Sequence, residues 1–182
     1  GFIEGLISRG LKPPCLVIMD GNRGLRGAVE KNWPGTAVQR CTVHKLRNLE
    51  RHAPRHALEE VKSDYHRIVY ADSLEQANKG YRDFVSKWKK LAPKVVVSLE
   101  EAGEELLSFY RFPNSQWKSL RTTNAIERLN GEFRRRVKTQ SSLPDARAAE
   151  RLLFGLICSG QIQMRRIDGW SDLKQVSPLK AA

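Results

Sequence analysis

The sequence predicts a helix-rich α/β fold, and three observations support this. Residues 15–19 have the length and apolar composition of a buried strand, and a second short strand is expected around residues 37–40. A helical pattern lies between them, and a strand, a helix and a strand in that order are how a layered α/β sheet is assembled. From residue 43 to about residue 107 the signals are almost all helical, with no strand pattern among them. We therefore expect a small sheet followed by a large helical block.

The first strand and the helix after it have clear boundaries. Residues 15–19 are entered through Pro13-Pro14 and closed by the turn sequence Asp20-Gly21. Apolar side chains then recur at helical spacing over residues 25–29, and Trp33-Pro34-Gly35 ends this helix. The second strand follows directly.

Later helices are predicted from their start signals and their periodicity. Ser73-x-x-Gln76 is a capping box that opens one helix, and Ala92-Pro93 separates two others. Ser142-Leu143-Pro144-Asp145 is a second capping box, which we expect to open a long helix through Ile157 toward Arg166. A helix from about residue 124 to residue 138 has an apolar stripe at i, i+3, i+7 and i+11. The stripe consists of Ile126, Leu129, Phe133 and Val137.

The composition favours a polyanionic partner. The 182 residues include 32 Lys and Arg against 20 Asp and Glu, a net charge of +12. The alternative is a basic surface with no nucleic-acid role. The three cysteines are far apart and form no Cys-x-x-Cys pair, which argues against a disulfide framework and fits a reducing, cytosolic compartment. No apolar run approaches the roughly 20 residues that cross a bilayer, so we expect no membrane association.

The basic residues are concentrated in one segment. Residues 111–140 contain eight Lys and Arg against two acids, and a block of one sign beside an apolar stripe favours phosphate contacts. Trp117 in this segment either stacks on an unpaired base or fills the core. The side chains that we expect to contact DNA are those of Arg121, Asn124, Arg128, Arg134, Arg135, Arg136 and Lys138.

Two carboxylates are candidates for binding a metal. Asp20 follows a buried strand, at the sheet edge where α/β folds place their ligands, although an ordinary Asp-Gly turn is the alternative. Glu127 lies at the start of the basic helix. With Asn124 as the N-cap, it would be the N3 residue of a capping box and would need no catalytic role.

Cys41 and His44 follow the second strand and offer metal-binding side chains. With His52 and His56 they provide the ligand types of a zinc site. Their spacing is not that of a recognised zinc module, and all four would come from one helix and its entry. Packing beside the second strand or contact with DNA is the expected role of this pair.

At these residues the sequence resembles the Mutator-type transposases of bacterial insertion sequences. The resemblance covers about residues 11–140, with the motifs in order and at plausible distances. The first stretch is Met19-Asp20-Gly21-Asn22-Arg23-Gly24-Leu25, and the second is Gln39-Arg40-Cys41-Thr42-Val43-His44-Lys45-Leu46-Arg47-Asn48. The others are Tyr110-Arg111-Phe112-Pro113 with Trp117-Lys118, and Arg121-Thr122-Thr123-Asn124-Ala125-Ile126-Glu127 before Arg134-Arg135-Arg136.

The resemblance implies a partial RNase H-like fold whose acidic DDE triad binds Mg²⁺ or Mn²⁺. Asp20 matches the second acid and Glu127 the third, and Cys41 and His44 match the family's Cys-x-x-His element. The implied division is a partial core over residues 1–45, a helical insertion over 46–115, and a return to the core over 116–182. The family commonly has proline where this chain has Ala125, which should alter the helix entry without removing the acid.

The implied activity is DNA cleavage and strand transfer at insertion-sequence ends, by a cytoplasmic, nucleoid-associated bacterial protein. Double-stranded DNA and further copies of the protein are the expected partners. Glu4 is the only acid before Asp20, and it lies in a helix-like stretch, so the first acid has no counterpart here. We therefore expect the chain to begin inside a larger protein and to be inactive alone. A truncated, non-cutting DNA-binding protein and an RNase H-like nuclease or resolvase are the alternatives.

Overall fold

The two predicted strands form a parallel sheet. β1 (Leu16–Met19) pairs with β2 (Ala37–Arg40), with Leu16 opposite Ala37 and Met19 opposite Arg40. Helix α2 (Arg23–Asn32) supplies the crossover that parallel neighbours need. The structure is a computed structural model that describes residues 1–138, 142–163 and 166–175. Within that part of the chain, β1 and β2 make up the whole sheet.

A small apolar cluster covers the sheet. It joins Ile3 of α1 (Phe2–Ser8) to Met19, Val29 and Trp33. Helix α2 contains the predicted helical segment and ends at the predicted stop, and its start is capped by the Asn22 side chain, which accepts a hydrogen bond from the Leu25 N–H at 2.9 Å. The predicted strand–helix–strand order is thereby confirmed.

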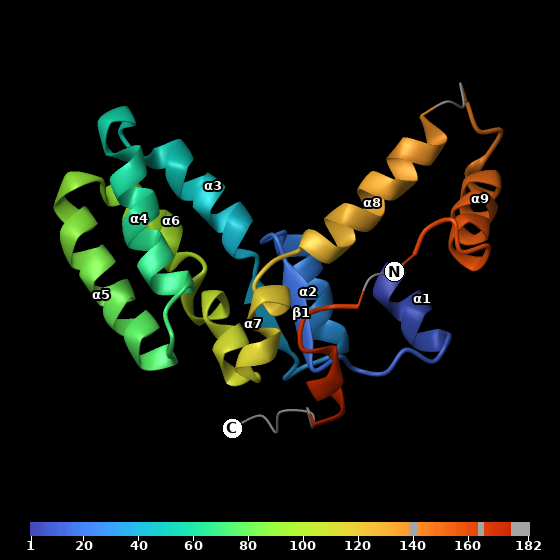
Figure 1. Ribbon diagram of the computed structural model, residues 1–182, viewed down its shortest axis with the longest axis horizontal. Helices are drawn as coiled ribbons and strands as arrows, with labels where there is room; N and C mark the ends of the chain where they lie inside the picture. The colour runs from blue at the N-terminus through green and yellow to red at the C-terminus, as the bar shows by residue number, and fades with distance from the viewer. Residues whose placement is uncertain (139–141, 164–165, 176–182) are drawn as a thin grey trace.

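Beyond β2 the chain is helical as far as Arg111, and Figure 1 shows this block as one lobe beside the sheet. The elements of the block are α3 (Thr42–His52), η1 (Arg55–Ala57), α4 (Leu58–Val69), α5 (Leu74–Leu91), α6 (Pro93–Glu100), η2 (Gly103–Leu106) and η3 (Ser108–Arg111). Its core includes Tyr65, Phe84, Trp88 and Phe109, each at most 1% exposed. The predicted start of α5 is confirmed, since Ser73 accepts from the Gln76 N–H.

The last elements are α7 (Asn114–Leu120), α8 (Asn124–Val137), α9 (Ala146–Cys158) and η4 (Trp170–Gln175). Helix α8 has the predicted extent and rises from the centre of the molecule as an arm (Figure 1). The capping-box prediction for α9 is wrong. Its N-cap is Asp145, which accepts from the Ala148 N–H at 2.7 Å, so the helix starts after residues 142–145 and ends well before Arg166.

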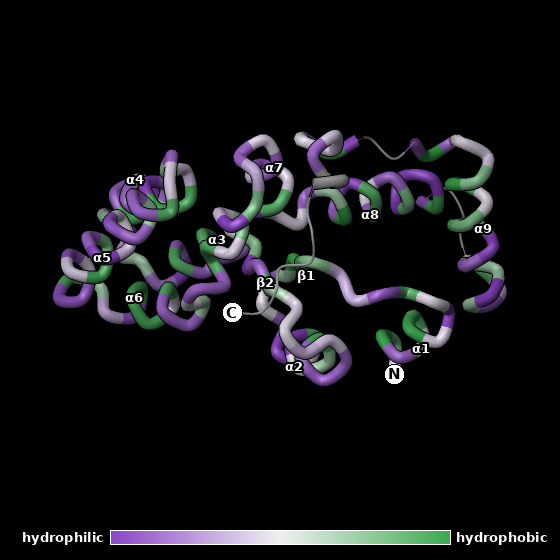
Figure 2. The backbone as a smooth tube through the Cα atoms, turned by 90° about the horizontal axis from the view of Figure 1, so that it is seen from below, coloured by the Kyte–Doolittle hydropathy of each residue, from purple (hydrophilic) through white to green (hydrophobic). Residues whose placement is uncertain are grey.

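Polar residues occupy much of helix α8. Figure 2 shows hydrophilic positions along much of α8, and none of its side chains is fully buried. Residues 139–141, 164–165 and 176–182, which fall in the predicted third segment, lie outside the described residues. No helix in the described part of the chain has the length and apolar character needed to cross a membrane.

Candidate functional site

The candidate site lies at the edge of the sheet where both strands end. Asp20 follows β1 and Cys41 follows β2, and the residues before them, Met19 and Arg40, are partners in the ladder. The Cys41 N–H donates to the Met19 carbonyl at 2.8 Å. Asp20 and Cys41 are therefore neighbours at the carboxyl edge, the position that the sequence predicts for Asp20. Asp20 is exposed, and its carboxylate accepts a hydrogen bond from the Asn22 N–H at 3.2 Å.

The turn after Asp20 requires glycine. Gly21 has φ +103°, a backbone conformation that residues with a side chain rarely adopt. A Cβ at this position would also lie 2.1 Å from Nη2 of Arg40. The Arg40 guanidinium therefore packs directly against the backbone of this turn, which fixes the chain next to Asp20.

Arg40 is held by a carboxylate from the helical block. Its Nη1 and Nη2 donate to the two oxygens of Glu101, at 3.0 and 2.9 Å, just after the end of α6. Lys45 Nζ donates to Oε2 of Glu101 at 2.6 Å and to the Ser98 carbonyl at 2.7 Å. The Arg40 and Lys45 side chains are only 7% and 2% exposed, so Glu101 neutralises two buried cations.

The charges shift the pKa values of this group. Burial raises the pKa of Glu101, but hydrogen bonds and attraction from Arg40 and Lys45 outweigh it and lower the pKa to about 2. Burial lowers the pKa of Lys45, against the opposing effect of Glu101. Glu101 is therefore a carboxylate at neutral pH and binds the block to the end of β2.

The connection between α7 and α8 reaches the same edge. The Thr42 N–H and hydroxyl both donate to the Arg121 carbonyl, at 2.9 and 3.0 Å. The Thr123 N–H donates to Cys41 Sγ at 3.4 Å. These bonds attach the start of α8 to the first turn of α3, and they bring Glu127 to the edge although it is far from Cys41 in sequence.

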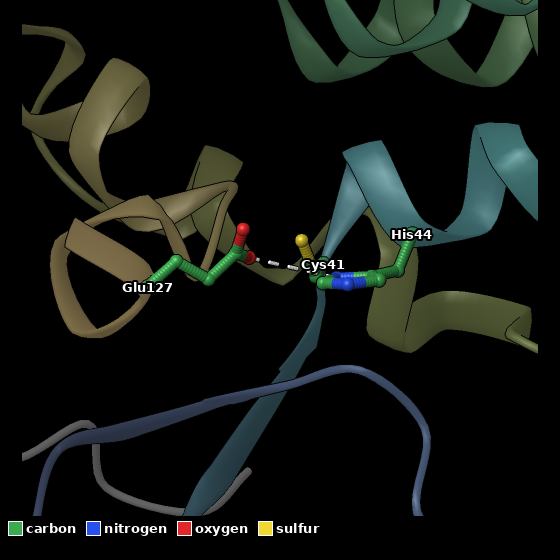
Figure 3. A group of neighbouring side chains, drawn as sticks. All are labelled: Cys41, His44 and Glu127. Atoms are coloured by element: carbon green, nitrogen blue, oxygen red, sulfur yellow. Dashed lines mark ion pairs between the residues drawn. The ribbon is translucent and has the colours of Figure 1, made fainter. Parts of the chain in front are cut away.

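Cys41, His44 and Glu127 form a cluster (Figure 3). One ligand atom of each lies within 4.8 Å of the others, and His44 Nδ1 is 3.9 Å from Glu127 Oε1. Cys41 is buried, whereas the side chains of His44 and Glu127 are 31% and 44% exposed. The cluster therefore has its thiol on the protein side and its imidazole and carboxylate toward solvent.

Thr123 lies among the three groups. Its hydroxyl donates to Glu127 Oε1 at 2.6 Å and lies 3.3 Å from Cys41 Sγ and 3.5 Å from His44 Nδ1. Thr123, and not Asn124, is the N-cap of α8. The capping-box alternative for Glu127 is therefore wrong, because Glu127 lies one position beyond N3 and its carboxylate binds the Thr123 hydroxyl.

The alternative zinc arrangement with four ligands is not formed. Among the described residues, the metal-ligand type side chains that cluster in a group of three or more are those of Cys41, His44 and Glu127. His52 is at the opposite end of α3 from His44, and His56 lies in η1. The length of α3 therefore separates His52 and His56 from Cys41, His44 and Glu127.

The predicted DNA-contacting side chains fall into two groups. Asn124, Arg128, Arg134 and Lys138 are exposed, and so is Arg135, whose side chain is 72% exposed although it also pairs with Glu132. Others make contacts within the protein, since Arg121 lies over the Tyr70 ring at 4.3 Å and donates to the Val69 carbonyl. Arg135 and Arg136 pair with Glu132, and Arg136 also donates to the Gln161 carbonyl.

Trp117 packs against the helical core. Its ring makes edge contacts with Phe109 and Tyr110, at centroid separations of 5.9 and 4.7 Å. Its indole N–H donates to the Phe112 carbonyl at 2.7 Å. This is the core role that the sequence offered as one of two alternatives.

Three residues at this edge have roles that sequence reasoning missed. Arg40, Glu101 and Thr123 position the turn after Asp20, the start of α3 and the Glu127 carboxylate. Arg40 and Thr123 stand inside the quoted motifs, next to Cys41 and before Glu127. Glu101 lies in the helical block, and its sequence context carries no sign of its partners.

Comparison with known proteins agrees with these motifs. The sequence profile described as "Transposase, Mutator family" matches residues 1–165. The chain belongs to the Mutator family of transposases. It is 34% identical over 155 residues to the transposase for insertion sequence element IS905 of Lactococcus lactis, which covers 85% of this chain and 39% of that protein. The family assignment confirms the resemblance seen in the sequence motifs.

Further relatives are similar over more than two thirds of this chain. The transposase for insertion sequence element ISRM5 of Rhizobium meliloti is 34% identical, over 85% of this chain and 39% of its own length. The transposase for IST2 of Acidithiobacillus ferrooxidans is 38% identical, over 69% of this chain and 43% of its own. The chain thus spans about two fifths of the length of these Mutator-family relatives.

Proposed function

We propose that this chain is part of the catalytic domain of a DNA transposase that cuts and joins DNA at insertion-sequence ends. Asp20 and Glu127 are the proposed ligands for Mg²⁺ or Mn²⁺, within a partial RNase H-like fold. The observation that supports this most strongly is that both acids adjoin Cys41. Asp20 does so through the register of the two strands, and Glu127 through ligand atoms within 4.8 Å.

The two acids suit a hard divalent cation. Both offer carboxylate oxygens, which Mg²⁺ and Mn²⁺ prefer. Both are open to solvent, so water molecules and phosphate oxygens have access to the remaining coordination positions. Asp20 and Glu127 would hold the cation, which would supply activation of the attacking hydroxyl and stabilisation of the charge on the departing oxygen.

The protein's own contribution is to hold these groups in place. The turn at Gly21, packed against Arg40, fixes the backbone that carries Asp20. The Thr123 hydroxyl orients Glu127 by a hydrogen bond of 2.6 Å. The exposed side chains of Arg128, Arg134 and Lys138 on and just after α8 are proposed to bind phosphates of duplex DNA.

The division of the chain is part of the same proposal. Residues 46–115 are the helical insertion between the acids, and residues 1–45 and 116–182 belong to the RNase H-like core. The first acid of the triad is proposed to come from a segment outside these 182 residues. The active assembly contains more than one copy of the protein.

The test is Mg²⁺-dependent nicking of duplex DNA that carries the terminal inverted repeats flanking the gene. The protein assayed is this chain preceded by the corresponding N-terminal segment of a Mutator-family relative. Nicking is expected from this extended protein and to be lost in Asp20→Asn and Glu127→Gln, with duplex binding retained. Glu132→Gln, on the same helix, is the matched control and is expected to remain active.

The outcomes separate the alternatives. Nicking without a strand-transfer product supports a nuclease or resolvase. Duplex binding without nicking in the extended protein supports a non-cutting DNA-binding role. Nicking by the 182-residue chain that survives Glu127→Gln contradicts the assignment of the acids.

A further inference from the structure

We propose that Cys41, His44 and Glu127 form a binding site for a divalent metal ion of the zinc class, separate in its chemistry from the Mg²⁺ site. A thiol and an imidazole are ligands that Zn²⁺ accepts and Mg²⁺ does not favour. The three side chains come from the end of β2, the first turn of α3 and the first part of α8. Their convergence therefore depends on tertiary structure.

The distances are close to those of a three-ligand zinc site. Bond lengths of about 2.0–2.3 Å in a tetrahedron place ligand atoms about 3.3–3.7 Å apart. Here the three atoms lie within 4.8 Å of one another, and the His44–Glu127 pair is at 3.9 Å. Side-chain movements of about 1 Å would bring the ligand atoms to the separations of a tetrahedral site. The His44 and Glu127 side chains are partly exposed to solvent, which permits such movements.

The Thr123 hydroxyl lies beside all three ligand atoms. Its hydroxyl oxygen is 2.6, 3.3 and 3.5 Å from the ligand atoms of Glu127, Cys41 and His44. A metal ion bound by these three atoms would displace the Thr123 hydroxyl from them and become their shared partner, with shorter bonds. The Thr123 N–H, 3.4 Å from Cys41 Sγ, would remain as a hydrogen-bond donor to a metal-bound sulfur.

Three protein ligands leave one tetrahedral position open to water. The buried Cys41 closes the protein side of the site, and the open position faces solvent between His44 and Glu127. A zinc ion bound at this site would hold the Glu127 carboxylate close to Cys41 and His44. Zinc would thereby withdraw Glu127 from Mg²⁺ binding, and this consequence alone rests on the proposed function.

The binding test uses Co²⁺ as a spectroscopic substitute for Zn²⁺ in the reduced 182-residue protein. We expect one equivalent of Co²⁺ to give a thiolate-to-cobalt charge-transfer band and visible bands of tetrahedral intensity, both abolished by Zn²⁺. The band should be lost in Cys41→Ser and kept in Cys158→Ser, which changes an exposed cysteine on α9.

His44→Ala and Glu127→Gln keep the protein interior intact, because both side chains are partly exposed. Each should weaken Co²⁺ binding at least tenfold, whereas the matched changes His52→Ala on α3 and Glu132→Gln on α8 should not. Absence of a thiolate band, or a band that persists in Cys41→Ser, would overturn the proposal and leave the cluster as a hydrogen-bonded group around Thr123.

The consequence for activity is measured separately. Zn²⁺ added to the extended protein should inhibit Mg²⁺-dependent nicking. With the activity of each protein expressed as a fraction of its activity without zinc, Cys41→Ser should be inhibited less than the unsubstituted protein. Equal inhibition of both proteins contradicts the link to Glu127. If the extended protein does not nick DNA at all, the transposase proposal fails, and the Co²⁺ spectra still decide the metal site.

Discussion

Glu101→Gln removes the one anion that the buried Arg40 and Lys45 share in this contact. Breaking a buried ion pair from one side costs about 3–5 kcal/mol, because the remaining charge is left without compensation. The Glu101 side chain is 40% exposed, and Lys45 keeps its bond to the Ser98 carbonyl, so the cost is reduced. We expect the free energy of unfolding to fall by about 2–3 kcal/mol, measured by urea denaturation near neutral pH.

The pH dependence gives an independent check. The pKa of Glu101 is lowered from 4.5 to about 2 in the folded protein, so between these values the unfolded state binds more protons. The stabilisation that the ionised Glu101 carboxylate provides is complete above its pKa in the unfolded state, 4.5, and is lost as the pH falls toward its pKa in the folded state, about 2. After allowance for solvent screening it amounts to about 1–2 kcal/mol. The stability difference between wild type and Glu101→Gln should therefore shrink below about pH 4.5.

The matched control is Glu30→Gln, which removes an exposed partner of Arg26 on α2. An exposed pair within one helix contributes about 0.3–0.5 kcal/mol, so this change should be nearly neutral. Two results would refute the reasoning about buried cations: a loss of less than about 1 kcal/mol of stability in Glu101→Gln, or a stability difference between wild type and Glu101→Gln that does not change with pH.

Three further predictions follow from the site. Gly21→Ala should lower the free energy of unfolding by at least about 2 kcal/mol in urea, because φ is +103° and the new Cβ meets Arg40, whereas Gly27→Ala in α2 should raise it by about 0.5–1 kcal/mol. Replacing Arg134, Arg135 and Arg136 by alanine should reduce the salt slope of duplex-DNA binding by about one to two, since Arg135 and Arg136 already pair with Glu132, and Arg82→Ala on α5 should not change it. Thr123→Val should lower the free energy of unfolding in urea by about 1 kcal/mol, because it removes the hydroxyl that binds Glu127. Thr36→Val is the control, and an equal loss of stability in both variants would contradict this reasoning.

The sequence predicted the local elements near the site better than their contacts. The strand before Asp20 and the helix that carries Glu127 follow from apolar period and turn residues, which are local signals. Proximity of Cys41, His44 and Glu127 was not predicted from spacing, because it depends on the bonds from Thr42 to the Arg121 carbonyl. The start of α9 was misplaced because Ser142 and Asp145 are both good caps, and local sequence does not decide which one the chain uses.

The helical block is attached to the sheet at the residues that flank Cys41. Gln39 donates to the Leu106 carbonyl and accepts from the Phe109 N–H, and Arg40 and Lys45 bind Glu101. Glu101, Leu106 and Phe109 lie at the end of the block, where its last helix gives way to η2 and η3.

Because these attachments are buried, a shift of the block would cost hydrogen bonds and uncompensated charge. The block therefore acts as a support that sets the position of Cys41 and of the turn after Asp20, and the start of α8 then docks on that fixed edge through Thr42 and Thr123. It follows that substitutions at Glu101 or Gln39 should disturb the candidate site although neither side chain belongs to the cluster of Cys41, His44 and Glu127.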